Sequence, residues 1–505
     1  MRVLLLSLLF LLSFSAQAED LYFTQNGAGS ADGSSIGNAW SLASANTAGN
    51  WGSGAGKVSA GDTLHVSGTI TNPLVIAGSG TVGNLITILF DSGAKFSKPH
   101  WNQSGVNKDS AIYATDKDYL LITGGTIEST ANGTSLANQQ NSVGISVWNG
   151  SHITISNVSV IDIYVRVNGA EMNYYGTGVD IFDSGTRSMN DIRITSCTMS
   201  NAGSSIGVSF NMMTNVVIDR NVLLNNGINI NIGDTSAGRV LDTCLVNNNT
   251  MVMGLNWSGW GGVHKNSLHT FAANSTSRIF RHRVYNNYCS GDMGDNATSY
   301  LFLEGMVTNA YLYNNLIVLP NSNATGNGFI FLKGTMDCLV ANNTIMGQAN
   351  SGIGIGAGTF GVWGTGTVVK NNLMHYVGAV IYDVISSLSQ CDYNVYFHPD
   401  ATGWFSPGGY SWTGWQSVPY DANSYTNEPT LSVSYAPTVG DTVARGKGVN
   451  LSAYFSEDKN GVTRPASAAW TIGAFDSESG GGPSTYLGFQ FGNGVKLIGP
   501  GSIRQ

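Results

Sequence analysis

Charged residues are scarce in this sequence. Only 11% of its 505 residues are Asp, Glu, Lys or Arg, and the formal net charge is -8. Proteins that bind nucleic acid or an anionic membrane by electrostatic attraction carry clusters of Lys and Arg. We therefore expect neither nucleic acid nor a charged membrane surface among the partners of this protein.

Cysteine is also rare. Its five copies are Cys197, Cys244, Cys289, Cys338 and Cys391. They are too few and too widely spaced for the disulfide framework of a small secreted domain. We expect most of them to be buried, where they act as small hydrophobic side chains.

Long apolar runs are missing after the first twenty residues. The chain begins with Met1 and Arg2, continues with a short apolar run and reaches Ala-Gln-Ala at 16–18. A charged start, a short apolar centre and small residues at a cleavage site are features of a secretory signal peptide, and the run is too short to span a bilayer. We predict a signal peptide over residues 1–18, an extracellular or periplasmic location and no membrane anchor.

A short motif is present in several copies along the chain. Three of them are LYNNLIV at 312–318, VANNTIM at 340–346 and VKNNLMH at 369–375. Other copies mark Asn221, Asn249, Asn287 and Asn394, and weaker ones place Asn157, Cys197 and Gly125 in the same slot. Repeats of this length are typical of solenoids, and short Val/Ile-rich runs between Gly, Asn, Asp and Ser predict strands. We predict a stack of β-coils.

Stacking explains why the repeated residue is Asn. Equivalent side chains in stacked coils lie about 4.8 Å apart, so their amides can hydrogen-bond along the stack. Asn also tolerates the left-handed backbone conformation that a sharp bend requires. We therefore predict an internal ladder that contains Asn315, Asn343 and Asn372.

Over residues 60–400 the chain resembles the right-handed parallel β-helix proteins of the pectate-lyase-like superfamily. TQNGAGSADGSSIGNAWSLASAN at 24–46 is similar to the N-terminal segment of secreted bacterial members, and residues 446–476, which end in IGAFD, are similar to their closing segment. The resemblance implies an all-β fold, a single-stranded right-handed parallel β-helix, because parallel crossovers are right-handed. The expected parts are an N-terminal cap at 19–60, the β-helix at 61–400, a C-terminal closing segment at 401–476 and a tail at 477–505.

The alternation along the strand before each ladder position predicts which side chains face outward. If the leucine before each of them points inward, His269, Glu304 and Lys333 stack outward on three successive coils. An acid and a base at this spacing could cleave a glycosidic bond, and we name these three as candidate catalytic residues. Asp180 and Asn229 are expected to hold the substrate further along the groove. The alternative is a cross-strand ion pair between Glu304 and Lys333 that only stabilises neighbouring coils.

Two insertions, at 164–178 and 254–269, lengthen their coils beside this column. Insertions on a solenoid often form its binding cleft. The second insertion contains Trp257, Trp260 and His264, which we predict to be substrate-binding because aromatic rings can pack against the apolar faces of sugars. The alternative is that these rings only pack the loop onto the helix.

Evidence for a metal site is weak in the sequence. It contains no Cys/His quartet with ligand spacing, so we predict no metal ligands. Asp292 and Asp295 could offer oxygen ligands to Ca²⁺, although an Asp-rich turn without a metal is the commoner case. Hydrolases of the family that the chain resembles typically show paired Asp at a strand end, and Asp180 and Asp183 match this only in part, because alternation places them on opposite faces.

We predict a secreted carbohydrate-active protein that cleaves a polysaccharide by β-elimination or hydrolysis. The rival hypothesis is a non-catalytic adhesion or matrix protein, in which the stack is a rigid carbohydrate-binding rod. An enzyme needs charged residues that converge in a cleft, whereas a rod needs only aromatic and amide residues along one face. The sequence leaves the identity of the sugar and the oligomeric state open.

Overall fold

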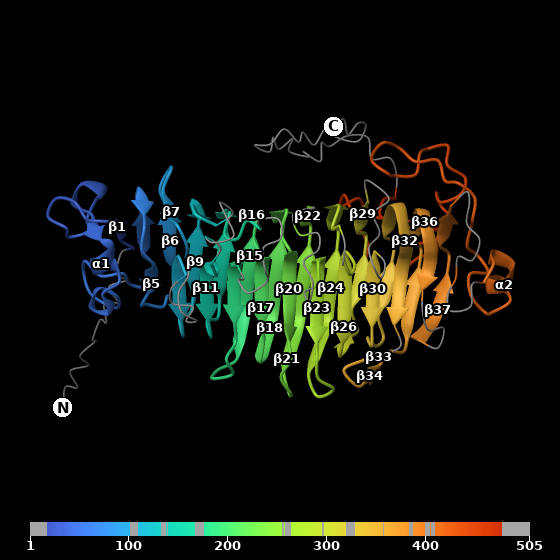
Figure 1. Ribbon diagram of the computed structural model, residues 1–505, viewed down its shortest axis with the longest axis horizontal. Coiled ribbons are helices and arrows are strands. Elements are labelled where there is room, and N and C mark those ends of the chain that lie inside the picture. The colour runs from blue at the N-terminus through green and yellow to red at the C-terminus, as the bar shows by residue number, and fades with distance from the viewer. Residues whose placement is uncertain are drawn as a thin grey trace, which may run out of the picture.

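The computed structural model describes residues 18–476 with gaps at 102–109, 133–137, 139, 167–175, 255–256, 258–263, 295–296, 320–328, 357, 383–386, 399–404 and 406–409, and only the backbone of 348–351 and 378–382. The body is a long stack of parallel strands (Figure 1). Almost all of the predicted signal peptide and the whole tail at 477–505 lie outside these residues. Across the described ranges, no helix is both long enough and apolar enough to cross a membrane.

A typical coil of the stack contributes one strand segment to each of three parallel sheets. Sheet 1 consists, in spatial order, of β2 (Trp40–Ser41), β1 (Asp20–Thr24), β3 (Thr63–Val66), β6 (Ile86–Phe90), β9 (Leu120–Thr123), β12 (Ile153–Ser156), β15 (Met189–Thr195), β18 (Met212–Asp219), β21 (Val240–Asn247), β24 (Arg278–Tyr285) with β27 (Val307–Thr308) beside it, β28 (Tyr311–Tyr313), β31 (Leu339–Ala341), β35 (Thr367–Lys370) and β37 (Leu388–Asp392).

Sheet 2 follows sheet 1 in every coil, after a sharp bend. It consists of β4 (Thr69–Ile70), β7 (Lys95–Lys98), β10 (Thr126–Ser129), β13 (Ser159–Ile161), β16 (Thr198–Ser200), β19 (Val222–Leu224), β22 (Thr250–Met253), β25 (Tyr288–Gly291), β29 (Leu316–Val318), the first parts of β32 (Thr344–Gly356) and β36 (Leu373–Tyr382), and β38 (Val395–Phe397).

Sheet 3 completes the coil. It consists of β5 (Leu74–Ile76), β8 (Ile112–Thr115), β11 (Ser142–Trp148), β14 (Gly176–Phe182), β17 (Ser204–Ser209), β20 (Ile228–Asp234), β23 (Asn266–Ala272), β26 (Leu301–Gly305), β30 (Ile330–Lys333) and the second parts of β32 and β36. The chain is therefore an all-β, right-handed parallel β-helix, and the fold expected from the repeats is confirmed.

Alternating side chains of each strand fill the inside of the helix. In sheet 1, Ile153, Ile192 and Val216 are partners on successive strands, and each is 0% exposed. Cys244 and His282 continue this column. The buried His282 Nδ1 donates to the Cys244 carbonyl oxygen at 3.0 Å, so its Nε2 accepts from the Thr270 hydroxyl at 3.2 Å. All five cysteines are buried and unpaired, as the sequence predicts.

The predicted Asn ladder lies at the bend between sheets 1 and 2. Each side-chain Nδ2 donates to the Oδ1 of the next ladder residue at 2.9–3.1 Å. The ladder runs through Asn221, Asn249, Asn287, Asn315, Asn343, Asn372 and Asn394. The residue before each of them has a φ of 51–59°, so the first Asn of a pair makes the left-handed bend and the second forms the ladder.

One expected position of the ladder is wrong. Asn157 is exposed and takes the left-handed conformation, with a φ of 53°. Val158 is 0% exposed and aligns with Cys197, because the Thr198 amide donates to its carbonyl oxygen. A small apolar residue thus fills the slot in this coil, and the Asn one position earlier makes only the bend.

Short helical turns lie at the N-terminal end of the stack, namely η1 (Ile36–Asn38), α1 (Leu42–Ala45) and η2 (Ala48–Asn50). At the other end, α2 (Trp412–Gln416) carries the buried Trp415, whose ring stacks on Phe405 at 4.5 Å. The chain then returns along the ladder corner (Figure 1). There the first Asn of three successive pairs donates from its side chain to a carbonyl oxygen of the returning segment. The bonds run from Asn314 to Glu457, from Asn342 to Thr471 and from Asn371 to Val449.

Candidate functional site

Sheet 3 carries the predicted catalytic residues, but one of them is out of the expected register. Glu304 on β26 lies opposite Lys333 on β30, as predicted, whereas His269 on β23 lies opposite Phe302. The expectation that His269 and Glu304 are direct partners is wrong by two residues. A shift of two keeps every inward side chain inward, so the hydrophobic pattern cannot distinguish the two registers.

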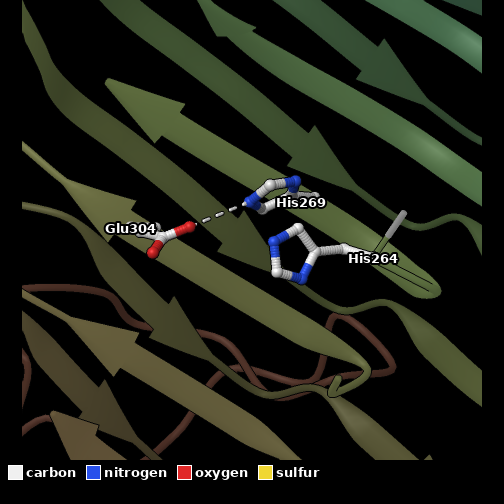
Figure 2. A group of neighbouring side chains, drawn as sticks. All are labelled: His264, His269 and Glu304. Carbon is white, nitrogen blue, oxygen red and sulfur yellow. Dashed lines mark ion pairs between the residues drawn. The ribbon is translucent and has the colours of Figure 1, made fainter. Parts of the chain in front are cut away.

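The side chains nevertheless converge on Glu304. His269 Nε2 lies 3.6 Å from Glu304 Oε2, and Lys333 Nζ lies 3.4 Å from Glu304 Oε1. Figure 2 shows His264, at the start of the same coil, with its ring turned toward the same space. Two residues predicted as catalytic and one predicted as substrate-binding therefore surround a single carboxylate.

Glu304 is held as a buried carboxylate. Only 5% of the residue is exposed, and Oε1 accepts a hydrogen bond from the Thr359 hydroxyl at 2.9 Å. Burial acts to raise the pKa of Glu304, but His269, Thr359 and Lys333 together outweigh it and lower the pKa below its usual value. The carboxylate is therefore ionised at neutral pH.

His269 lies in an aromatic stack on the outward face. Its ring stacks on Phe302 at 4.9 Å and on Phe271 at 4.7 Å, and the residue is 6% exposed. Burial lowers the pKa of His269, although Glu304 opposes the shift, so the imidazole is neutral at neutral pH. At 3.6 Å from Glu304, its Nε2 has no hydrogen-bond partner among the residues that the structure describes.

His264 is exposed and oriented by a single polar contact. Its Nδ1 forms a 2.8 Å hydrogen bond with the Thr298 hydroxyl, and its ring lies 4.8 Å from the ring of His269. Lys333 is the more accessible of the two partners in its ion pair, since 37% of its side chain is exposed against 7% for Glu304. A bound molecule can thus reach His264 and Lys333 directly.

An aromatic hairpin that the sequence did not reveal lies beside this cluster. The antiparallel strands β33 (Gly358–Thr359) and β34 (Val362–Trp363) supply Thr359 to Glu304 and expose Phe360 at 43% and Trp363 at 72%. The hairpin projects from the lower edge of the body (Figure 1). Its coil has an ordinary spacing between ladder residues, so repeat length gives no sign of it, and the cluster of Phe and Trp between glycines is the only signal.

Two of the predicted substrate-binding residues do not face a ligand. Asn229 is 0% exposed, and its Oδ1 accepts from Asn226 Nδ2 at 2.8 Å. Trp257 is 1% exposed, donates from Nε1 to the Asn225 carbonyl and packs against Tyr164. Their predicted outward positions are wrong: the Asn229 side chain is hydrogen-bonded to Asn226 and Met253, and the Trp257 ring packs against Tyr164. Trp260 lies outside the described residues.

The two aspartates near the end of β14 have different environments. Asp180 is partly buried, accepts from the Ser146 hydroxyl at 3.3 Å and has a pKa that burial raises to about 6. Asp183 is 2% exposed and accepts from the amides of Asn211 and Met212, so it fixes a turn. Asp183 thus binds backbone amides of a turn, whereas Asp180 accepts from a side chain of the neighbouring strand.

The possible Ca²⁺ site stays a prediction. Asp292 is 8% exposed, and its Oδ1 accepts from the Gly294 amide at 2.8 Å. Asp295 lies outside the described residues.

No protein-family model matches the chain, and no curated protein matches it. Solved structures of similar shape include the GH136 lacto-N-biosidase from Eubacterium ramulus, at 12% identity and a TM-score of 0.48 over 81% of this chain and 67% of that chain. The pectate lyase Pel9A matches at 15% identity and 0.40 over 92% and 97%, and PfbA, a surface adhesin of Streptococcus pneumoniae, at 13% and 0.41 over 65% and 82%. The fold itself is established by the strand pairing, and the chain is a right-handed parallel β-helix protein.

Proposed function

We propose that the protein is an exported enzyme that cleaves an acidic polysaccharide by β-elimination on the outward face of sheet 3. The observation that carries this proposal is the convergence of His269 and Lys333 on the buried carboxylate of Glu304, beside an exposed aromatic hairpin. Ionisable groups gathered at one accessible place are typical of a catalytic site.

Elimination fits these residues better than hydrolysis does. Glycoside hydrolysis generally uses two carboxyl groups about 5–9.5 Å apart. Asp180, the other carboxylate of the predicted site, lies on β14, four strands before Glu304 in sheet 3, which corresponds to about 19 Å. Asp180 and Glu304 thus cannot act on one glycosidic bond.

β-Elimination requires the transfer of a proton and the stabilisation of negative charge. A base removes the proton on the carbon next to the sugar carboxylate, a C=C bond forms, the bond to the glycosidic oxygen breaks and that oxygen gains a proton. We assign the proton that the glycosidic oxygen gains to the ammonium group of Lys333, which a bound chain can reach and whose charged partner is Glu304. The neutral imidazole of His269 is the group that can accept the proton removed from the sugar carbon.

The aromatic hairpin supplies a surface for the sugar chain. Phe360 and Trp363 are exposed next to the strand that carries Glu304. Aromatic rings of this kind pack against apolar faces, while polar groups at their edges remain in water. The substrate would therefore lie over sheet 3 with the hairpin against one end of the cleaved bond.

A screen of the purified protein against acidic and neutral polysaccharides tests the proposal. Elimination gives an unsaturated product that absorbs ultraviolet light, whereas hydrolysis gives new reducing ends without this absorbance. Lys333→Ala should abolish cleavage, and Lys95→Ala should not, although Lys95 forms a similar ion pair with Glu128 at 2.7 Å. Retained cleavage in Lys333→Ala, or product without ultraviolet absorbance, would overturn the proposal.

A non-catalytic rod is the second candidate function. The pair of Lys95 and Glu128 joins neighbouring strands of sheet 2 away from the cluster, so the same kind of pair forms in this helix outside the proposed site. If no tested glycan is cleaved while one is bound, the rod is favoured.

A further inference from the structure

Three potential metal ligands meet at the cluster on sheet 3. His264, His269 and Glu304 each offer one ligand atom, and these atoms lie within 4.8 Å of one another. Figure 2 shows both rings and the carboxylate facing a common space. The sequence gives no hint of this arrangement, because the three residues do not have the spacing of a known metal motif.

The strongest sign of a ligand is the unpaired nitrogen of His269. Its side chain is 7% exposed, and Nε2 has no hydrogen-bond partner in the described part of the chain. A buried polar atom without a partner costs free energy, so a bound group is a reasonable explanation for it. The atom lies 3.6 Å from Glu304 Oε2, close to the roughly 3.4 Å that separates two ligands of one tetrahedral Zn²⁺.

The other polar contacts leave suitable lone pairs for a metal. The Nδ1 of His264 is engaged with the Thr298 hydroxyl, which leaves Nε2 as its ligand atom. The Oε1 of Glu304 is engaged with the Thr359 hydroxyl, which leaves Oε2 on the side of His269. Metal ligands are usually oriented by outer hydrogen bonds of this kind.

We propose that His264, His269 and Glu304 bind one divalent transition-metal ion of the Zn²⁺ class. Two imidazoles and one carboxylate form a ligand set that zinc uses when it keeps a coordination position open. Ca²⁺ prefers oxygen ligands, so this site differs in kind from the one considered at Asp292. The proposal depends only on the ligands and holds whether or not the protein cleaves a glycan.

Lys333 competes with the metal for Glu304. Its ammonium group lies 3.4 Å from Oε1, and a second cation on the same carboxylate would repel it. Because 37% of its side chain is exposed, Lys333 can turn toward solvent when the ion binds. Zn²⁺ should therefore bind more tightly once this positive charge is removed.

Metal titration of the full-length protein, first stripped with a chelator, tests the site. We expect one Zn²⁺ per chain by equilibrium dialysis, visible absorption bands when Co²⁺ replaces it, and no comparable binding of Ca²⁺. His264→Ala should weaken Zn²⁺ binding by at least ~100-fold, since even loss of an outer partner costs 10–100-fold. His152→Ala is the matched control, because His152 also contacts a carboxylate, that of Asp191, at 3.1 Å.

Two results would overturn the proposal. One is wild-type Zn²⁺ affinity no higher than that of His264→Ala, with both proteins folded by circular dichroism. The other is weaker Zn²⁺ binding in Lys333→Met, where the assigned competition predicts tighter binding. Neither measurement uses catalysis, so failure of this site and failure of the proposed function are distinguishable.

Discussion

At the ladder corner, equivalent positions of successive coils keep the same residue, whereas equivalent positions on the outward face of sheet 3 change from coil to coil. At the corner, Asn315, Asn343 and Asn372 continue one chain of hydrogen bonds. On the outward face, Phe271, Glu304 and Lys333 are successive partners. Inside, close packing and the cost of an unpaired amide restrict each position. Outside, the scaffold leaves side chains free to vary, and this freedom allows a site.

Among the substitutions that distinguish the outward face from the interior, Glu304→Gln should have the largest effect, and that effect should be on the rate of cleavage. This change keeps the shape of the side chain but removes the negative charge that pairs with the Lys333 ammonium group. Glu304 is the charged partner of the proton-transferring Lys333, so we expect cleavage to fall by about the 10²–10⁴-fold that proton transfer by a positioned side chain contributes. Rates from the ultraviolet assay, measured beside the thermal unfolding of the same variant, check it. An unchanged rate would show that Glu304 takes no part in the cleavage.

The interior should respond to pH through His282. Burial lowers the pKa of His282 from 6.5 to about 4, so between these values the unfolded chain binds a proton there that the folded chain does not. The free energy of unfolding should therefore fall as the pH falls through this window, by on the order of 3 kcal/mol near pH 4. Denaturant unfolding from pH 7 to pH 4 measures this dependence. His282→Gln should flatten it, and an equally steep profile in that variant would contradict the assignment.

The ladder should be sensitive to a single apolar substitution. Asn343→Leu removes the oxygen that accepts from both the backbone and the side-chain amide of Asn315, and it removes one donor to Asn372 Oδ1, in a buried corner, at a cost of about 1–3 kcal/mol. Denaturant midpoints for the wild type and the variant check this. The control is Asn190→Leu on the exposed side of β15, where a change within about 0.5 kcal/mol is expected. Equal effects of the two substitutions would argue against a ladder that stabilises the corner.

These contrasts explain how far the sequence could predict the structure. The fold and the ladder were predictable because buried positions repeat in every coil. Asn157 was misplaced because bend and ladder both accept Asn, and only the buried Val158 distinguishes their register. The two-residue error at His269 has a similar origin, since inward and outward faces alternate with a period of two.

The approach of residues from different coils could not be predicted from spacing. His264 lies beside Glu304 because its ring contacts Thr298 and Phe302 of the next coil. Trp257 is buried against Tyr164 from another insertion. Contacts of this kind depend on loop paths, which do not repeat and leave no periodic signal. Of the residues named from the sequence that the structure describes, only His264, His269, Glu304 and Lys333 lie together, and the loop path that brings His264 to the others has no signal in the sequence.

The smallest expected effect tests whether the aromatic hairpin belongs to the functional face. Trp363 is 72% exposed, so Trp363→Ala should leave the free energy of unfolding within about 0.5 kcal/mol of the wild type. Loss of one aromatic contact, worth about 0.5–1.5 kcal/mol, should weaken glycan binding by roughly 2–10-fold. Tyr454→Ala is the control. Tyr454 is also an exposed aromatic residue, but it lies in the C-terminal closing segment, so this variant should bind the glycan as the wild type does. Equal affinity in both variants would remove the hairpin from the glycan surface. Because Thr359 of this hairpin also donates to Glu304, the hairpin would then serve only to hold the carboxylate.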